Sequence, residues 1–127
     1  MIKKRECKKV KVGNIFIGGD SKITVQSMLN IPAHDSEGNV RQALELEKAG
    51  CEIIRLAVPD MESVSTVAAL KENLTIPVVA DIHFDYKLAL ASLDAGVDKI
   101  RINPGNIGKD ENVKAVADAC KMRGVPI

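Results

Sequence analysis

The chain has 127 residues, with 18 Lys and Arg against 17 Asp and Glu, so its formal charge is +1. This balance argues against a polybasic protein that binds nucleic acid or an anionic membrane surface. Hydrophobic residues make up 46% and charged residues 28%, which is typical of a globular chain and not of a disordered one. Aromatic residues make up only 2%, so the core must be aliphatic and base-stacking platforms are not expected.

No apolar run approaches the roughly 20 residues of a membrane span. The basic start, Met1–Lys9, is not followed by an apolar stretch, so we expect a cytoplasmic protein with no membrane partner. The three cysteines, Cys7, Cys51 and Cys120, lie far apart and form no C-x-x-C pair. They predict reduced structural thiols, without a disulfide framework or a metal site.

Two hydrophobic periodicities alternate along the chain. A short β-hairpin is predicted over residues 8–18, because Gly13-Asn14 separates two runs of β-branched residues. Four strand-then-helix units follow from residue 23 onward. The expected strands span residues 23–28, 52–58, 78–83 and 98–102, and the expected helices span residues 36–49, 61–72, 85–95 and 110–123.

Helix ends are predicted from capping residues. Asp35 or Ser36 is expected to cap the first helix, and Asp110 the last. Three glycines lie just past helices, where a left-handed residue is favoured: Gly50, Gly96 and Gly124.

Two of the units resemble each other. Residues 49–56 and 95–102 share Ala, Gly, an acid, Ile and Arg in the same register, and residues 123–127 resemble the start of a third copy. Repeated βα units imply parallel strands covered by helices, as in a (β/α)8 barrel or an open doubly wound sheet. No glycine-rich nucleotide fingerprint follows the first strand, which weakens the open-sheet alternative.

A complete (β/α)8 barrel needs about 250 residues. We therefore predict an α/β fold that is the N-terminal half of a (β/α)8 TIM barrel. It would have four βα units, the start of a fifth strand, and the hairpin as a plug under the bottom of the barrel. Four strands alone leave two open edges, so a homodimer or higher oligomer is expected.

Polar residues interrupt the predicted strands near their C-terminal ends, where TIM barrels carry their sites. The second strand contains Arg55, the third Asp81 and His83, and the fourth Arg101 and Asn103. Alternation places Asp81 and His83 on one face. Arg55 and Arg101 occupy matching repeat positions, so two guanidinium groups are expected to share one pocket. Their planar forks suit an anionic ligand such as phosphate.

Structural readings of the same residues stay open. Arg55 could pair with Asp81, and Arg101 with an acid elsewhere in the barrel. His83 could be a hydrogen-bonded core residue. The loop Asn103–Asn106 predicts a tight turn whose exposed amides can hold phosphate oxygens, although on its own it is only a turn. His34 lies on the loop after the first strand and has no assigned role.

Four motifs together resemble one family, the 4-hydroxy-3-methylbut-2-en-1-yl diphosphate synthases: Val25–Met28, Arg55–Met61, Val79–Asp85 and Lys99–Gly108. The resemblance implies an N-terminal (β/α)8 barrel that holds a diphosphate and a C-terminal domain with a [4Fe–4S] cluster on three Cys and a Glu. It implies reductive conversion of the cyclic diphosphate 2-C-methyl-D-erythritol 2,4-cyclodiphosphate to 4-hydroxy-3-methylbut-2-enyl diphosphate. This is an oxidoreductase of non-mevalonate isoprenoid biosynthesis, with flavodoxin or ferredoxin as electron donor.

The resemblance also implies which residues line the substrate pocket: Arg55, Asp81, His83, Arg101, Asn103 and Asn106. It implies that residues 1–127 form a partial barrel that binds substrate, without the iron–sulfur domain and without cluster ligands. This chain alone is therefore expected to show no reductase activity, and no catalytic residue is assigned in it. The loop over residues 29–35 departs from the family's Thr-Asn-Thr-x-Thr-x-Asp pattern, because only Asn30 and Asp35 remain.

Two other functions are compatible with the pattern. One is a pterin-binding barrel of the dihydropteroate synthase type, in which Asp81 and Asn103 would bind the pteridine edge. The other is a non-catalytic half-barrel that serves as a phosphate-binding or scaffold module.

Overall fold

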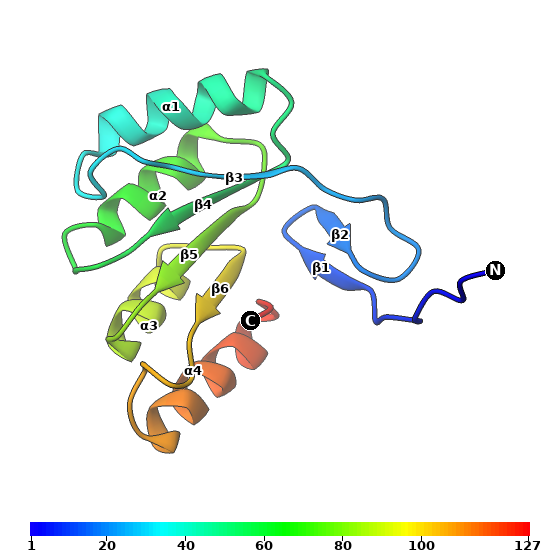
Figure 1. Cartoon of the computed structure of the whole chain (residues 1–127). Helices are drawn as coiled ribbons and strands as arrows, with labels where there is room; N and C mark the ends of the chain where they lie inside the picture. Colours follow the sequence, from blue (N-terminus) through cyan, green and yellow to red (C-terminus); the bar gives the residue numbers. More distant parts are fainter.

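The computed structural model describes residues 1–127 and contains a hairpin, a four-stranded sheet and four helices (Figure 1). The hairpin comes first and consists of β1 (Val10–Val12) and β2 (Ile15–Ile17), which pair antiparallel. Gly13 and Asn14 form the turn between them, and Gly13 has a φ of +57°, which glycine adopts without strain. The predicted hairpin is confirmed.

The larger sheet is parallel and follows the order of the chain. Its strands are β3 (Gln26–Met28), β4 (Ile53–Ala57), β5 (Val78–Ile82) and β6 (Lys99–Ile102), paired as β3-β4-β5-β6. The helices that connect or follow them are α1 (Ser36–Lys48), α2 (Val64–Asn73), α3 (Tyr86–Asp94) and α4 (Asp110–Arg123). A doubly wound sheet would reverse its strand order at a switch point. This sheet has no reversal, so the structure agrees with half of a barrel.

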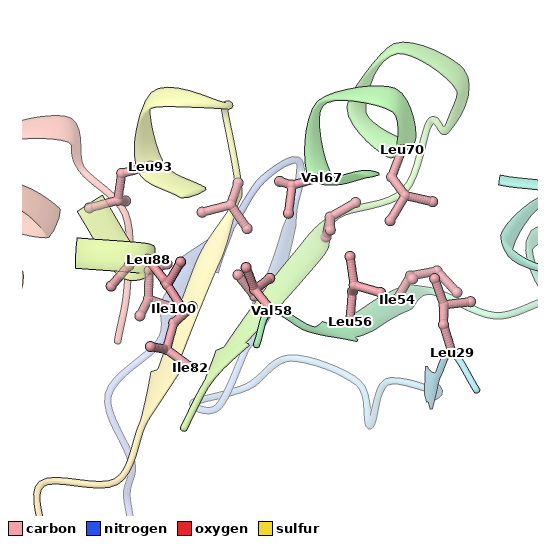
Figure 2. Packing of buried hydrophobic residues seen from close by; sticks show 14 of the residues in the cluster. Leu29, Ile54, Leu56, Val58, Val67, Leu70, Ile82, Leu88, Leu93 and Ile100 are labelled. Carbon is pink, nitrogen blue, oxygen red and sulfur yellow. The ribbon is translucent and has the colours of Figure 1, made fainter. Parts of the chain in front are cut away.

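One hydrophobic core joins the sheet to the helices. Every second strand residue, such as Ile54, Leu56 and Ile82, packs toward the helices, where Leu70 and Leu88 meet them (Figure 2). The cluster contains 20 buried residues and draws on all four helices, so the helices lie on one face of the sheet (Figures 1 and 2). We call the opposite face the inner face. By alternation, it carries Gln26, Met28, Ile53, Arg55, Ala57, Val79, Asp81, Lys99 and Arg101.

The stagger of the strands matches a TIM barrel. Arg55 lies level with Val79, and Val79 lies level with Lys99. Lys99 of β6 is therefore level with Arg55 of β4. Arg101, which occupies the same position in the sequence repeat as Arg55, lies two residues further along β6. This drift of about one residue per strand would accumulate to about eight over eight strands, which is the shear of a TIM barrel.

The hairpin docks at the N-terminal ends of β5 and β6. A Cβ on Gly13 would lie 3.1 Å from both the Pro77 side chain and the Asp98 carboxylate, so the hairpin approaches these residues closely. The Asn14 amide donates a hydrogen bond of 3.5 Å to the carbonyl of Thr75. The hairpin therefore occupies the bottom of the half-barrel, as predicted.

Three acids fasten this same end of the sheet, and we call their contacts the acid ties. Each carboxylate accepts a hydrogen bond from the backbone N–H at or just before the start of a strand: Glu52 from Val25 (3.2 Å), Glu47 from Thr75 (2.9 Å) and Asp98 from Val78 (2.8 Å). Asp98 also forms an ion pair with Lys71 of α2, at 2.6 Å. The acid ties stabilise the end of the sheet that carries no candidate site.

Two predicted element starts are three residues too early, the other strand and helix ends lie within one residue of the predictions, and one predicted cap is wrong. The first strand of the sheet begins at Gln26, three residues later than predicted. The helix α2 begins at Val64, because the Asp60 carboxylate accepts hydrogen bonds from the N–H and hydroxyl of Ser63 and holds residues 61–63 in a turn. The expected cap at Asp110 is wrong: Lys109 precedes α4 and no side chain caps it.

Other helix ends confirm the predictions. The Asp35 carboxylate caps α1 by accepting a hydrogen bond from the N–H of Gly38. The three glycines after the helices all have positive φ, and in the repeat pair Gly50 and Gly96 it is +103° and +92°. The predicted start of a fifth strand lies beside β6, because the N–H of Ile100 donates to the carbonyl of Pro126 at 3.0 Å. None of the four helices combines the length and hydropathy that crossing a membrane requires.

Candidate anion-binding site

Asp81 is the centre of a charged cluster on the inner face. It lies in the middle strand β5 and only 1% of its surface is exposed. Its Oδ2 accepts hydrogen bonds from Arg55 Nε (3.1 Å) and Nη2 (2.5 Å), and its Oδ1 accepts one from Arg101 Nη1 (3.1 Å). The two arginines therefore reach the same carboxylate from the two neighbouring strands.

This arrangement combines two sequence hypotheses. The two guanidinium groups do converge on one place, as their repeat positions predict. Arg55 also pairs with Asp81, which was the structural alternative. The expectation that Arg101 would find a different acid is wrong, because Arg101 shares Asp81. The sharing follows from the strand stagger, which places Arg101 level with Asp81 in the sheet.

His83 completes the cluster. It lies two residues beyond Asp81, and its Nε2 is 3.3 Å from Asp81 Oδ2. Burial pushes the pKa of Asp81 upward, but hydrogen bonds and charge from Arg55, aided by His83, bring that pKa below its ordinary value. Asp81 is therefore ionised at neutral pH and partly neutralises the two arginines.

The cluster keeps an excess of positive charge. Two guanidinium groups face one carboxylate, so the sum is +1 with His83 neutral and +2 with His83 protonated. The side chains of Arg55 and Arg101 are 29% and 44% exposed, so both remain accessible to a ligand. Each guanidinium has five N–H donors and uses only part of them on Asp81. An anion can therefore bind both arginines without displacing Asp81.

The predicted turn after β6 is present. Asn103 Oδ1 accepts a hydrogen bond from the N–H of Gly105 at 3.0 Å, and the Asn103 carbonyl accepts two more, from Asn106 at 2.9 Å and Ile107 at 3.1 Å. Both asparagines are exposed. The turn closely follows Arg101, but neither Asn103 nor Asn106 is hydrogen-bonded to the Asp81 cluster. The structure thus joins four of the six predicted residues and places the other two beside them.

One further cation on the inner face was missed. Lys99 lies level with Val79 and two residues before Arg101, so alternation along β6 places it on the same face. That alternation was visible in the sequence and could have identified Lys99.

A cavity of about 160 Å³ adjoins His83 and is lined by Val58, Pro59, Phe84, Asp85 and Leu88. Larger hollows, of about 440 and 450 Å³, lie away from the cluster, at the outer side of α1 and α2 and beside residues 4–7.

The cysteines do not fit an iron–sulfur cluster. Cys51 and Cys120 are buried and Cys7 is exposed near the N-terminus, and no three His, Cys, Asp or Glu side chains gather as a metal site. Burial also raises the pKa of the Cys120 thiol, which disfavours the thiolate that a metal needs.

Comparison with known proteins decides the family. A sequence profile described as the GcpE TIM-barrel domain matches residues 7–127. The chain belongs to the GcpE TIM-barrel family. This GcpE chain is 53% identical over 128 residues to the 4-hydroxy-3-methylbut-2-en-1-yl diphosphate synthase (flavodoxin) of Caldanaerobacter subterraneus subsp. tengcongensis, with 100% of the chain and 36% of that protein covered. It is 57% identical over 120 residues to the protein of the same name from Caldicellulosiruptor saccharolyticus, covering 94% of the chain and 35% of that protein.

The GcpE chain thus spans about a third of the length of these relatives. Among solved structures, it is similar to dihydropteroate synthase from Xanthomonas albilineans, with a TM-score of 0.70 and 20% sequence identity. That likeness covers 87% of the GcpE chain and 46% of the synthase chain. At this identity it shows the fold alone, and it agrees with the predicted half-barrel.

Proposed function

We propose that this chain is the substrate-binding, N-terminal part of the barrel of a 4-hydroxy-3-methylbut-2-en-1-yl diphosphate synthase. Its substrate would be 2-C-methyl-D-erythritol 2,4-cyclodiphosphate, and the whole protein would be an oxidoreductase of isoprenoid biosynthesis. The observation that carries this proposal is the pair of half-exposed guanidinium groups on either side of buried Asp81. The relatives' names support the reaction class, and the excess positive charge of the cluster supports binding of a diphosphate.

In this proposal, Arg55 and Arg101 bind the phosphate oxygens with the N–H groups that Asp81 leaves free. Asp81 holds the two guanidinium planes in place, so that less entropy is lost on binding. The exposed edge of His83 donates a further hydrogen bond. Asn103 and Asn106 offer amide N–H groups at the end of the neighbouring strand. Charge-assisted contacts of this kind position an anion more tightly than neutral ones.

The redox part of the reaction is assigned outside residues 1–127. The family resemblance implies a [4Fe–4S] cluster elsewhere in the longer protein. The relatives' names point to flavodoxin as the proposed electron donor, with ferredoxin as the other candidate. The contribution of this chain is binding and orientation of the cyclic diphosphate.

Calorimetric titration of the chain with the cyclodiphosphate tests the proposal. Each of Arg55→Ala and Arg101→Ala should weaken binding by roughly tenfold to a hundredfold, since a hydrogen bond to a charged group contributes about 1.5–3 kcal/mol. Arg41→Ala is the matched control, because Arg41 is exposed on α1, far in the fold from the inner face. Binding that is unchanged in Arg101→Ala would contradict the proposal.

The same titration separates the two alternatives. Preferential binding of a pterin over the cyclodiphosphate would support a pterin-binding barrel. Weak binding of inorganic phosphate by a stable oligomer, unaffected by Arg101→Ala, would support a non-catalytic module. No contact in the chain favours either of these over the cyclic diphosphate.

A further inference from the structure

The loop that joins β3 to α1, residues 29–35, is held by buried side chains of two helices. Asn39 of α1 is fully buried, and its Nδ2 donates hydrogen bonds of 2.9 Å to the carbonyls of Pro32 and Asp35. Thr66 of α2 is also fully buried, and its hydroxyl donates to the carbonyl of Ala33 at 2.7 Å. Consecutive stretches of the loop backbone are therefore fixed from both sides.

Only one polar side chain of this loop has no partner. Asn30 is bound to Gln42 through both its backbone N–H (3.0 Å) and its side-chain oxygen (2.5 Å). The Asp35 carboxylate is occupied by its cap on Gly38. His34 is exposed and its imidazole makes no hydrogen bond or ion pair within the chain. A well-held loop thus presents one free imidazole.

His34 lies at the same end of the barrel as the Asp81 cluster, because its loop follows the C-terminal end of β3. It also lies beside the next loop. The hydroxyl of Thr66, on the helix that follows that loop, donates to the carbonyl of Ala33, the residue just before His34. In agreement with this, the pKa of Asp60, on the loop after β4, is lowered chiefly by hydrogen bonds from Ser63 and to a smaller extent by His34. The inner face of β3 carries Gln26 and Met28 and no cation. His34 is therefore an available N–H donor on this side.

We infer that His34 is a specificity-determining residue of the proposed site, which binds a phosphate oxygen or hydroxyl of the substrate on the β3 side. Thr66 and Asn39 are positioning residues that act through the loop they hold. This inference rests on the proposed function. A fixed loop presents its donor without first losing conformational freedom, so loosening the loop should weaken binding even though Thr66 does not touch the ligand.

The first test uses the longer synthase of which, under the proposed function, this chain is a part. Affinity for the cyclodiphosphate is measured by calorimetry, and KM and kcat by steady-state kinetics. His34→Ala should raise Kd and KM by roughly tenfold, with a smaller change in kcat, as expected for the loss of one hydrogen bond to a charged group. His34→Gln retains an N–H donor and should recover part of the loss.

The second test concerns Thr66. Thr66→Val keeps the shape but removes the donor from the Ala33 carbonyl, whereas Thr66→Ser keeps the hydroxyl. Thr66→Val should raise Kd by about threefold to tenfold and speed hydrogen exchange of the loop amides, and Thr66→Ser should restore both. Ser65→Ala is the matched control, because the Ser65 hydroxyl donates to the Glu62 carbonyl in the turn before α2 and forms no hydrogen bond with the loop.

The outcomes are distinct. If Arg101→Ala abolishes binding while His34→Ala leaves Kd and KM within twofold, His34 has no role and the proposed function stands. If Arg101→Ala also leaves binding unchanged, the proposed function fails and the inference fails with it. If Thr66→Val leaves loop exchange and Kd equal to those of Ser65→Ala, the positioning role is wrong.

Discussion

Replacing Asp81 by Asn tests how the charged cluster is held together. The substitution keeps the shape of the side chain but removes the charge that Arg55 and Arg101 share. One amide oxygen can still accept from one arginine, while the other arginine loses its acceptor and faces a like charge. The amide NH₂ would itself point a donor at a guanidinium group. The cluster should therefore lose most of its internal attraction.

The expected cost is about 2–3 kcal/mol. Two charge-assisted contacts are each worth about 1.5–3 kcal/mol, and removing one member of a fully buried ion pair costs about 3–5 kcal/mol. The arginine side chains are 29% and 44% exposed, so water compensates part of this loss. For 127 residues with an unfolding entropy of about 2.1 cal/mol/K per residue, Tm should fall by about 7–11 °C.

Urea and thermal unfolding of the purified chain measure this difference. Asp118→Asn is the matched control, because it breaks the exposed Lys114–Asp118 ion pair of 2.6 Å and should cost no more than about 0.5 kcal/mol. The pKa of Asp81 is lower in the folded chain than its ordinary value of 3.8. The stability that ionised Asp81 contributes is therefore complete above the ordinary pKa. It is lost as the pH falls through the lower, folded-state pKa.

The difference in unfolding free energy between Asp81→Asn and the unchanged chain should therefore be constant near neutral pH. It should shrink below about pH 4. If Asp81→Asn is as stable as Asp118→Asn at pH 7, Asp81 does not hold the cluster. A gap that stays constant down to pH 2 would show that the stabilisation comes from shape and not from charge.

Three other predictions follow from the fold. Asp35→Ala should destabilise the chain by about 1 kcal/mol through loss of the α1 cap, whereas Asp110→Ala, which caps nothing, should cost less than about 0.5 kcal/mol in the same urea titration. Gly96→Ala should cost about 1–2 kcal/mol from backbone strain alone, since φ is +92° and a Cβ there would meet no atom; an unchanged urea midpoint would contradict the left-handed geometry. Light scattering of the 127-residue chain should show a dimer or larger species, because the outer edge of β3 is unpaired; a monomer would argue against pairing through this edge.

Much of the fold could be predicted because local signals agree with it. The alternation of strand and helix periods, the turn at Gly13-Asn14 and the glycines after the helices all carry local meaning, and each is confirmed. The start of a helix was harder to predict where a side chain holds the preceding residues in a turn. Asp60 holds the turn before α2 through Ser63, and nothing in the spacing of apolar residues reveals that contact.

The candidate site was predictable in its residues but not in its pairing. Polar side chains on buried strands identified Arg55, Asp81, His83 and Arg101. Which acid each arginine meets depends on the strand register, and register is a property of two strands together. Sharing of Asp81 therefore emerged only from the structure. The hydrogen bond from Thr66 to the loop before α1 could not be predicted either, because 33 residues separate Thr66 from Ala33.

The acid ties bear on how the chain folds. Each one joins a strand start to a residue in a neighbouring unit, with sequence separations of 27, 28 and 20 residues. A unit can therefore be fastened to its predecessor once about 30 residues have followed, without waiting for distant parts of the chain. Contacts over such short sequence separations allow the βα units to fold in order from the N-terminus during synthesis. The Asp81 cluster, which spans three strands, would form only after β6 has joined.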